Sequence, residues 1–190
     1  MKINENIRNL LTYSSDVYAT HQPALIWALE NTEGDVLELG MGDSSTVLLH
    51  EILKDTERKL VSVEDDTSWA EKFIHLKSAN HELNVIERSV NDWKMATDEY
   101  AKKKWGVVFV DQGYGEEIWR PARNYSVSEL MNSAEYVVAH DADLFHEMKS
   151  KEYSCFIYYP TKKVDASRGG PPTYIFSKKH DLDNIFITEP

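Results

Sequence analysis

The sequence has few of the features that mark secreted and membrane proteins. Its 190 residues contain a single cysteine, Cys155, so no disulfide can form within the chain. Cys155 lies in an apolar and aromatic run, where buried filler is a better interpretation than a nucleophile. No run approaches the roughly 20 apolar residues that span a bilayer, and the polar segment 1–6 lacks the apolar core of a secretion signal. We therefore expect a cytoplasmic protein without a membrane segment.

Positive charge is also scarce. The chain has 21 Lys and Arg against 32 Asp and Glu, a formal net charge of −11, which opposes the phosphate contacts of non-specific nucleic-acid binding. The one dense basic cluster, Lys102-Lys103-Lys104, is explained by a solvated helix end. We therefore expect a small-molecule substrate rather than a nucleic acid, and the sequence leaves a homo-oligomer open.

The length fits one α/β domain rather than two of ordinary size. We divide it into an N-terminal helical cap, 1–33, and the main body, 34–190. Apolar residues at helical spacing predict two helices in the cap, separated by a polar break at 14–16. This region either lines a ligand site or forms a surface connection between the helices; the residues in question are Tyr13, Tyr18 and His21.

From residue 35 onward, short β-rich runs alternate with helical ones. We predict strands at 35–39, 60–64, 84–88, 106–111, 136–140, 154–159 and 173–177. We predict helices at 44–54, 67–79, 92–103, 126–133 and 143–150, with Ser68 and Glu71 as a capping box for the second. Alternation predicts a doubly wound, mostly parallel seven-stranded sheet covered on both faces, and the last two strands predict an antiparallel hairpin. The connections 112–125 and 160–172 are expected to be long loops.

The stretch 35–46 combines an apolar strand, two glycines spaced by one residue, and a Ser/Ser/Thr cluster that opens a helix. Gly40 and Gly42 allow a sharp turn and close approach of a ligand, while the helix start offers free N–H donors. This pattern is typical of a turn that binds a nucleotide. Ser45 stands where a dinucleotide-binding turn has its third glycine.

Acidic side chains follow the predicted strands, at the sheet edge where ligands of parallel sheets bind. Glu64 closes the second strand, where a carboxylate accepts hydrogen bonds from ribose hydroxyls. The alternative is that Glu64-Asp65-Asp66 simply starts the next helix. The other strand-end residues are Glu38, Asp92-Trp93, Asp111 and His140-Asp141.

With Glu38-Leu39-Gly40-Met41-Gly42 and these acids, the chain resembles the class I S-adenosylmethionine-dependent methyltransferases over about residues 34 to 178. The resemblance implies that S-adenosylmethionine is the cofactor. Its methionine end would lie at Glu38, Gly40, Gly42 and Ser44, with Ser45 beside them. Glu64, with Asp65 next to it, would bind the ribose, and Asp92 with Trp93 as a stacking wall would bind the adenine. Ser44 departs from the usual third small residue of the loop but is still small.

The segments Phe109-Val110-Asp111-Gln112-Gly113 and Val137-Val138-Ala139-His140-Asp141 are similar to small bacterial methyltransferases with VDxG and VVxHD strands, many of which act on oxygen of small molecules or sugars. His140 could take the proton of an acceptor hydroxyl, with Asp111 or Asp141 orienting it. The alternative is that His140 caps the strand end.

A metal site is a further interpretation of the same region. Asp111, His140, Asp141, Asp143 and His146 are rich in oxygen and imidazole donors. Metal-dependent catechol-type methyltransferases use an Asp after strand four and an Asp-Asn pair after strand five, and here Ala142 replaces that Asn. We therefore do not favour a divalent metal and assign no metal ligands.

The loop after Asp111 holds aromatic and Arg side chains that could bind a planar or anionic substrate, or pack against the sheet or a second subunit; they are Tyr114, Trp119, Arg120, Arg123 and Tyr125. Two other functional classes stay open. An NAD(P)-binding oxidoreductase would share the turn and Glu64, but the chain leaves little room for a substrate domain. A non-catalytic cofactor-binding or partner subunit would keep the fold without an acceptor pocket.

Overall fold

The computed structural model describes residues 4–113, 116–141, 152–160 and 170–190. The expected helix 143–150, with Asp143 and His146, lies outside these residues, as do Tyr114 and most of the 160–172 connection. Among the helices of the described ranges, none has both the length and the apolar character needed to cross a bilayer.

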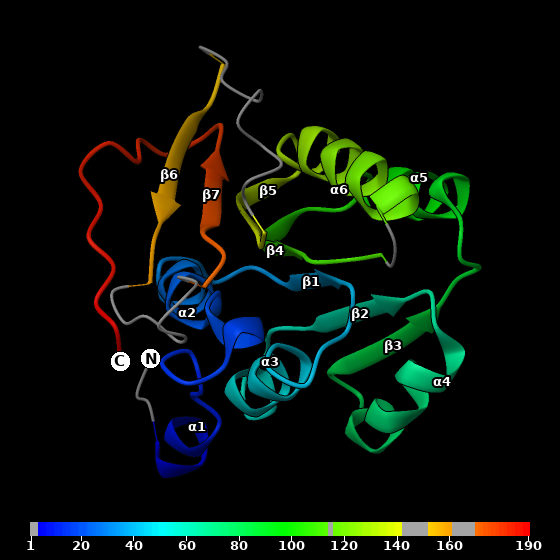
Figure 1. Cartoon of the computed structure of the whole chain (residues 1–190), viewed down its shortest axis with the longest axis horizontal. Helices are drawn as coiled ribbons and strands as arrows, with labels where there is room; N and C mark the ends of the chain where they lie inside the picture. The colour runs from blue at the N-terminus through cyan, green and yellow to red at the C-terminus, as the bar shows by residue number, and fades with distance from the viewer. Residues whose placement is uncertain (1–3, 114–115, 142–151, 161–169) are drawn as a thin grey trace.

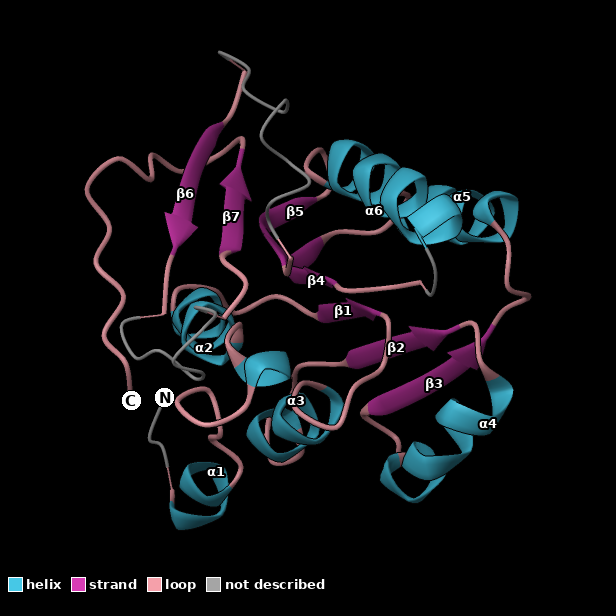
Figure 2. Ribbon diagram, in the orientation of Figure 1, coloured by secondary structure: helices cyan, strands magenta, loops and turns pink. Residues whose placement is uncertain are grey.

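The fold is a seven-stranded sheet with helices on both faces (Figures 1 and 2). Its strands are β1 Val36–Leu39, β2 Leu60–Glu64, β3 His81–Val85, β4 Trp105–Val110, β5 Ala134–Ala139, β6 Ser154–Tyr158 and β7 Thr173–Ser177. The order is β3-β2-β1-β4-β5-β7-β6. The first five strands pair in parallel, while β7 pairs antiparallel with both β5 and β6. This confirms the predicted fold class, including the C-terminal hairpin.

The helices divide between the two faces. They are α1 Glu5–Asn9, α2 Gln22–Glu30, α3 Thr46–Leu53, α4 Thr67–Ala70, α5 Val90–Tyr100 and α6 Glu116–Leu130, with 3-10 helices η1 Val17–Ala19 and η2 Glu71–Leu76. Buried residues of α2 and α3 form one core with one face of the sheet, and buried residues of α5 and α6 form a second core with the other face (Figure 1). The N-terminal cap therefore shares its core with the sheet.

Three predicted elements were wrong in extent. Strand β3 begins three residues before the predicted 84, because polar His81 and Glu82 pair with β2 at an edge of the sheet, where a strand does not need apolar residues on both faces. The segment 67–79 splits into α4 and η2. Its cap is Asp66, whose carboxylate accepts from the Trp69 N–H at 3.0 Å, so the Ser68/Glu71 capping box is not formed.

The predicted loop 112–125 is mostly helix. Helix α6 begins at Glu116, ten residues before the predicted start, and continues through Pro121. Its buried stripe, Ala122, Arg123, Ser126, Val127 and Leu130, has helical spacing. Pro121, a residue typical of loops, obscured this stripe in the sequence. Arg123 therefore lies on a helix that covers the sheet and not in a loop.

Candidate functional site

A cleft of about 1080 Å³ lies at the carboxyl ends of the parallel strands. The turn after β1 forms its floor, and the residues that follow β2, β4 and β5 also line it. The segment 16–21 of the N-terminal cap and Pro171 complete the lining. The cleft therefore lies where ligands of open parallel sheets bind.

Gly40 is required by the geometry of the turn. Its φ is 92°, a conformation that side chains with a Cβ rarely adopt, and a Cβ there would lie 2.5 Å from the Asp111 carbonyl oxygen. The close approach brings the turn after β1 against the end of β4. One substitution here would disturb both strand ends.

Glu38 stabilises this turn through buried hydrogen bonds and does not line the cleft. The Glu38 side chain is fully buried and accepts hydrogen bonds from the hydroxyls of Ser45 at 2.6 Å and Thr46 at 3.0 Å, and from Ser62 at 2.6 Å. Burial raises the pKa of Glu38 to about 7, against the lowering effect of these three hydrogen bonds. The role of Glu38 in this structure is to hold the start of α3 and β2 together.

Gln22 fixes the turn to the N-terminal cap. Its amide nitrogen donates to the Ser44 carbonyl at 2.9 Å and to the Leu10 carbonyl at 3.0 Å, while its amide oxygen accepts from the N–H groups of Thr12 and Tyr13. The side chain is fully buried. Sequence reasoning missed Gln22, which reads locally only as a residue next to a helix start.

Glu64 lies beside the turn and lines the cleft. Its carboxylate accepts from the N–H groups of Met41 at 2.8 Å, Asp65 at 2.9 Å and Asp66 at 3.0 Å. The Glu64 carboxyl also shares a hydrogen bond with the Asp65 side chain, which favours the protonated form of Glu64. Burial raises the pKa of Glu64 to about 7, although the three backbone donors act to lower it.

Asp92 and Trp93 do not line the cleft. Trp93 lies on the buried face of α5, and its indole N–H donates to Asp65 Oδ2 at 3.0 Å. Asp92 belongs to the start of α5, where its N–H donates to the Ser89 hydroxyl. Trp93 therefore acts on the site through Asp65, which lines the cleft and also pairs with Arg88 at 3.5 Å.

Trp69 lines the cleft beyond Glu64 and forms an aromatic wall there. Its indole N–H donates to the Met41 carbonyl at 2.8 Å, which links α4 to the glycine turn. Arg88 lines the same end and pairs with Asp66 at 2.7 Å. Neither residue was predicted; the signal for Trp69 was its position one turn after the strand-end acids.

Arg123 joins the ends of β4 and β5. Arg123 Nη2 contacts Asp111 Oδ1 at 2.7 Å and also donates to the Asp111 carbonyl. Its Nη1 donates to Asp141 Oδ2 at 3.1 Å and to the His140 carbonyl. Its Nε donates to the Gln112 carbonyl. All five guanidinium N–H groups are thus used. Asp141 has a φ of 55°, which is strained for a residue other than glycine, and Arg123 contacts it directly.

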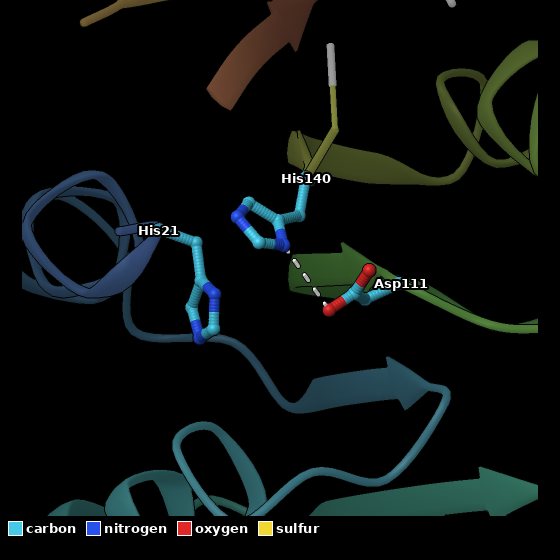
Figure 3. A group of neighbouring side chains, drawn as sticks. All are labelled: His21, Asp111 and His140. Carbon is cyan, nitrogen blue, oxygen red and sulfur yellow. Dashed lines mark hydrogen bonds and ion pairs between the residues drawn. The ribbon is translucent and has the colours of Figure 1, made fainter. Parts of the chain in front are cut away.

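His140 and His21 come together beside Asp111 (Figure 3). His140 Nδ1 lies 3.3 Å from Asp111 Oδ2, and its Nε2 lies 3.0 Å from the Thr20 hydroxyl. Burial alone would lower the pKa of His140, but the charge and hydrogen bond of Asp111 outweigh it and raise that pKa. Burial would raise the pKa of Asp111, but the charges of Arg123 and His140 lower it to about 2. Both nitrogens of His140 are therefore engaged.

His21 stacks at an angle on Phe109 and edge-on to His140, with ring centroids 4.7 Å and 4.8 Å away. Burial, with the nearby His140, lowers the pKa of His21 to about 3, so its imidazole is neutral near pH 7. The ring lines the cleft. Of the two interpretations of this part of the cap, the structure therefore favours the ligand-site lining over a surface connection.

Comparison with known proteins finds similarity in structure alone. No protein-family model and no curated protein matches the sequence. The fold is similar to the O-methyltransferase from Bacillus cereus in complex with SAH, with a TM-score of 0.58 at 13% identity over 93% of this chain and 91% of that one. It is also similar to cofactor-bound Rv0187 from MTB, with a TM-score of 0.62 at 12% identity over 94% and 91% of the two chains. The plantazolicin methyltransferase BamL, in complex with a triazolic desmethylPZN analog and SAH, gives a TM-score of 0.54 at 11% identity over 88% and 85%. The chain therefore has the fold of the class I S-adenosylmethionine-dependent methyltransferases.

Proposed function

We propose that the protein is an S-adenosylmethionine-dependent methyltransferase that methylates an oxygen of a small molecule. The observation that carries the proposal is one continuous cleft at the carboxyl edge of the sheet. It extends from Glu64, past the turn at Gly40, to Asp111 and Asp141. A cofactor bound along the turn would have its adenosine at one end of this cleft and its reactive methyl group at the other.

The cofactor end rests on the turn and on Glu64. Gly40 and Gly42 line the cleft without a Cβ, so a methionine moiety can approach the backbone. The Glu64 carboxyl lines the cleft and suits a ribose hydroxyl, and Trp69 offers an aromatic face on the adenine side. In this proposal Glu38 and Ser45 hold the turn rather than the ligand, because they are bonded to each other below it.

The acceptor end rests on Asp111 and Asp141. Their side chains are 24% and 44% exposed, so both carboxylates can reach an acceptor hydroxyl, whereas His140 is 4% exposed. Methyl transfer is an in-line displacement in which the C–S bond of the cofactor breaks to leave S-adenosylhomocysteine, the O–C bond forms, and the hydroxyl proton passes to the carboxylate of Asp111 or Asp141. The protein's main contribution would be to align the oxygen with the methyl group and exclude water.

The experiment is calorimetric titration of the purified chain with S-adenosylmethionine, S-adenosylhomocysteine and NAD. We expect both sulfur ligands to bind and NAD not to bind. Glu64→Ala should weaken S-adenosylhomocysteine binding at least tenfold, about 1.4 kcal/mol. The control is Glu87→Ala, an exposed acid in the same region that does not line the cleft. Binding of NAD alone would show an oxidoreductase, and binding of none of the three would remove the cofactor from the proposal.

A further inference from the structure

Three side chains of types that can bind metal ions come from separate parts of the chain and converge beside the acceptor end of the cleft. They are His21 at the start of α2, Asp111 after β4 and His140 after β5 (Figure 3). Each contributes one donor atom, and these atoms lie within 4.8 Å of one another. The convergence depends on the N-terminal cap, because His21 comes from outside the parallel strands.

His21 provides the first sign that this cluster is a binding site. Its side chain is 1% exposed; one ring nitrogen can make at most a weak hydrogen bond to the Ser44 backbone, and the other has no hydrogen-bond partner among the described residues. A buried polar group without a partner is costly, by roughly 1–3 kcal/mol. Such an arrangement is typical of a side chain kept for a ligand.

Thr20 orients His140 in the way that metal-binding histidines are oriented. The Thr20 hydroxyl has one proton, which it can donate to the Pro171 carbonyl at 3.1 Å. His140 Nε2–H then donates to the Thr20 oxygen, at 3.0 Å. In this tautomer His140 Nδ1 presents a lone pair toward Asp111 Oδ2, 3.3 Å away. Either a proton, as in the His140–Asp111 hydrogen bond described above, or a metal ion can lie between these two atoms.

Arg123 leaves Asp111 Oδ2 available to bind a metal ion. It binds Asp111 through Oδ1, whereas Oδ2 is the oxygen that faces His140. The local charge also allows a further cation, since the carboxylates of Asp111 and Asp141 face one guanidinium.

We propose that His21, His140 Nδ1 and Asp111 Oδ2 bind a late first-row divalent metal ion, with Zn²⁺ as the expected type. Two imidazoles and one carboxylate are the ligands such ions prefer, and Mg²⁺ prefers oxygen alone. The site thus differs in chemistry from the Asp and Asp-Asn set noted above. The proposal departs from our expectation that the chain has no metal ligands. A bound ion would lower the pKa of a coordinated acceptor hydroxyl at the end of the cleft formed by Asp111 and Asp141.

The geometry needs a small adjustment. Ligand atoms around a tetrahedral Zn²⁺ with bonds of about 2.0–2.1 Å lie about 3.3 Å apart. The widest pair here, at no more than 4.8 Å, must therefore close by about 1.5 Å. A rotation of the His21 side chain, which at most a weak hydrogen bond to the Ser44 backbone restrains among the described residues, can supply this movement.

The test uses the full chain, first stripped with a chelator and then titrated with Zn²⁺, Co²⁺ or Mg²⁺. We expect one Zn²⁺ per chain, a Co²⁺ complex with the strong visible bands of low coordination number, and no Mg²⁺ binding at matched concentration. His21→Gln should weaken Zn²⁺ binding more than about 100-fold, and Thr20→Val should weaken it about 10–100-fold, as loss of a partner that orients a ligand does. His75→Gln, at an exposed histidine, is the matched control and should bind as the unaltered protein does.

Unchanged Zn²⁺ affinity in His21→Gln, no Zn²⁺ or Co²⁺ binding, or tighter binding of Mg²⁺ than of Zn²⁺ would each overturn the proposal. If His21→Gln does not fold, X-ray absorption of the unaltered Zn²⁺ complex decides. Scattering from two imidazoles supports the site, and one or none refutes it. These readouts need no methyl acceptor, so the metal site can fail while S-adenosylmethionine binding stands, and the reverse.

Discussion

Removal of the Ser62 hydroxyl should destabilise the protein and loosen the glycine turn together. Ser62 lies on β2 between two buried groups: it donates to Glu38 Oε2 at 2.6 Å, and its oxygen lies 3.0 Å from His81 Nε2. Because the Ser62 proton goes to Glu38, His81 must donate through Nε2. His81 Nδ1, 3.0 Å from His50 Nδ1, then accepts from His50. One hydroxyl therefore connects α3, β3 and the acid beneath the turn.

The magnitude follows from the groups left behind. Ser62→Ala would leave Glu38 Oε2 and His81 Nε2–H buried and unpaired, since these side chains are 0% and 2% exposed. An unsatisfied buried polar group costs about 1–3 kcal/mol, and more when it is charged. We expect the free energy of unfolding to fall by about 2–4 kcal/mol, the sum for two groups with partial relaxation. S-adenosylhomocysteine binding should weaken as well, because Glu38 also holds Ser45 and Thr46.

The assay is urea unfolding of the unaltered chain and of Ser62→Ala, with Ser133→Ala as the matched control. Ser133 is as buried, at 2% exposed, but its hydroxyl donates only to the Leu130 carbonyl, which also accepts from the Ser133 N–H. Its removal leaves that carbonyl paired and should cost less than about 1 kcal/mol. If Ser62→Ala loses no more stability than Ser133→Ala, the proposed hydrogen-bond chain is wrong.

Two other perturbations test the charges of the site. Arg123→Ala removes the cation that contacts Asp111 and Asp141 and should lower the free energy of unfolding by about 3–5 kcal/mol, measured in urea, as breaking one side of a buried pair does; a loss below 1 kcal/mol would mean that the two strand ends do not depend on it. Glu38→Gln tests the raised pKa of Glu38. A carboxyl whose pKa rises from 4.5 to about 7 on folding stabilises the protein at low pH, and that stabilisation is lost as pH rises through about 7. The stability of the unaltered chain relative to Glu38→Gln should therefore fall by up to about 3 kcal/mol between about pH 4.5 and 8. A constant difference would show that Glu38 is ionised throughout.

The parts of the site that follow from local sequence could be predicted. A β-branched run, two glycines and a hydroxyl cluster predict β1, its turn and α3 from contiguous residues. The acids at the ends of β2 and β4 could be placed because parallel strands end at one edge of the sheet. The C-terminal hairpin likewise follows from two β-rich runs without a helix between them.

The remaining parts depend on packing between distant segments. The aromatic ring of Trp93 suits stacking on an adenine, but α5 orients the side chain toward the core. There its indole N–H donates to Asp65. Arg123 was assigned to a loop because Pro121 obscured the helical stripe. The proximity of His21 to His140 is created when α2 packs on the sheet, with 118 residues between the two histidines, and no pattern within either segment encodes that contact.

The central claim is that the cleft binds S-adenosylmethionine with its methyl group toward Asp111 and Asp141. A crystal structure of the chain with S-adenosylhomocysteine tests it most directly. The account predicts a ribose hydroxyl hydrogen-bonded to Glu64, the amino-acid end along the backbone at Gly40 and Gly42, and the sulfur atom facing the space beside Asp111. A ligand bound elsewhere, or one in the cleft with its sulfur turned away from Asp111 and Asp141, would contradict the account.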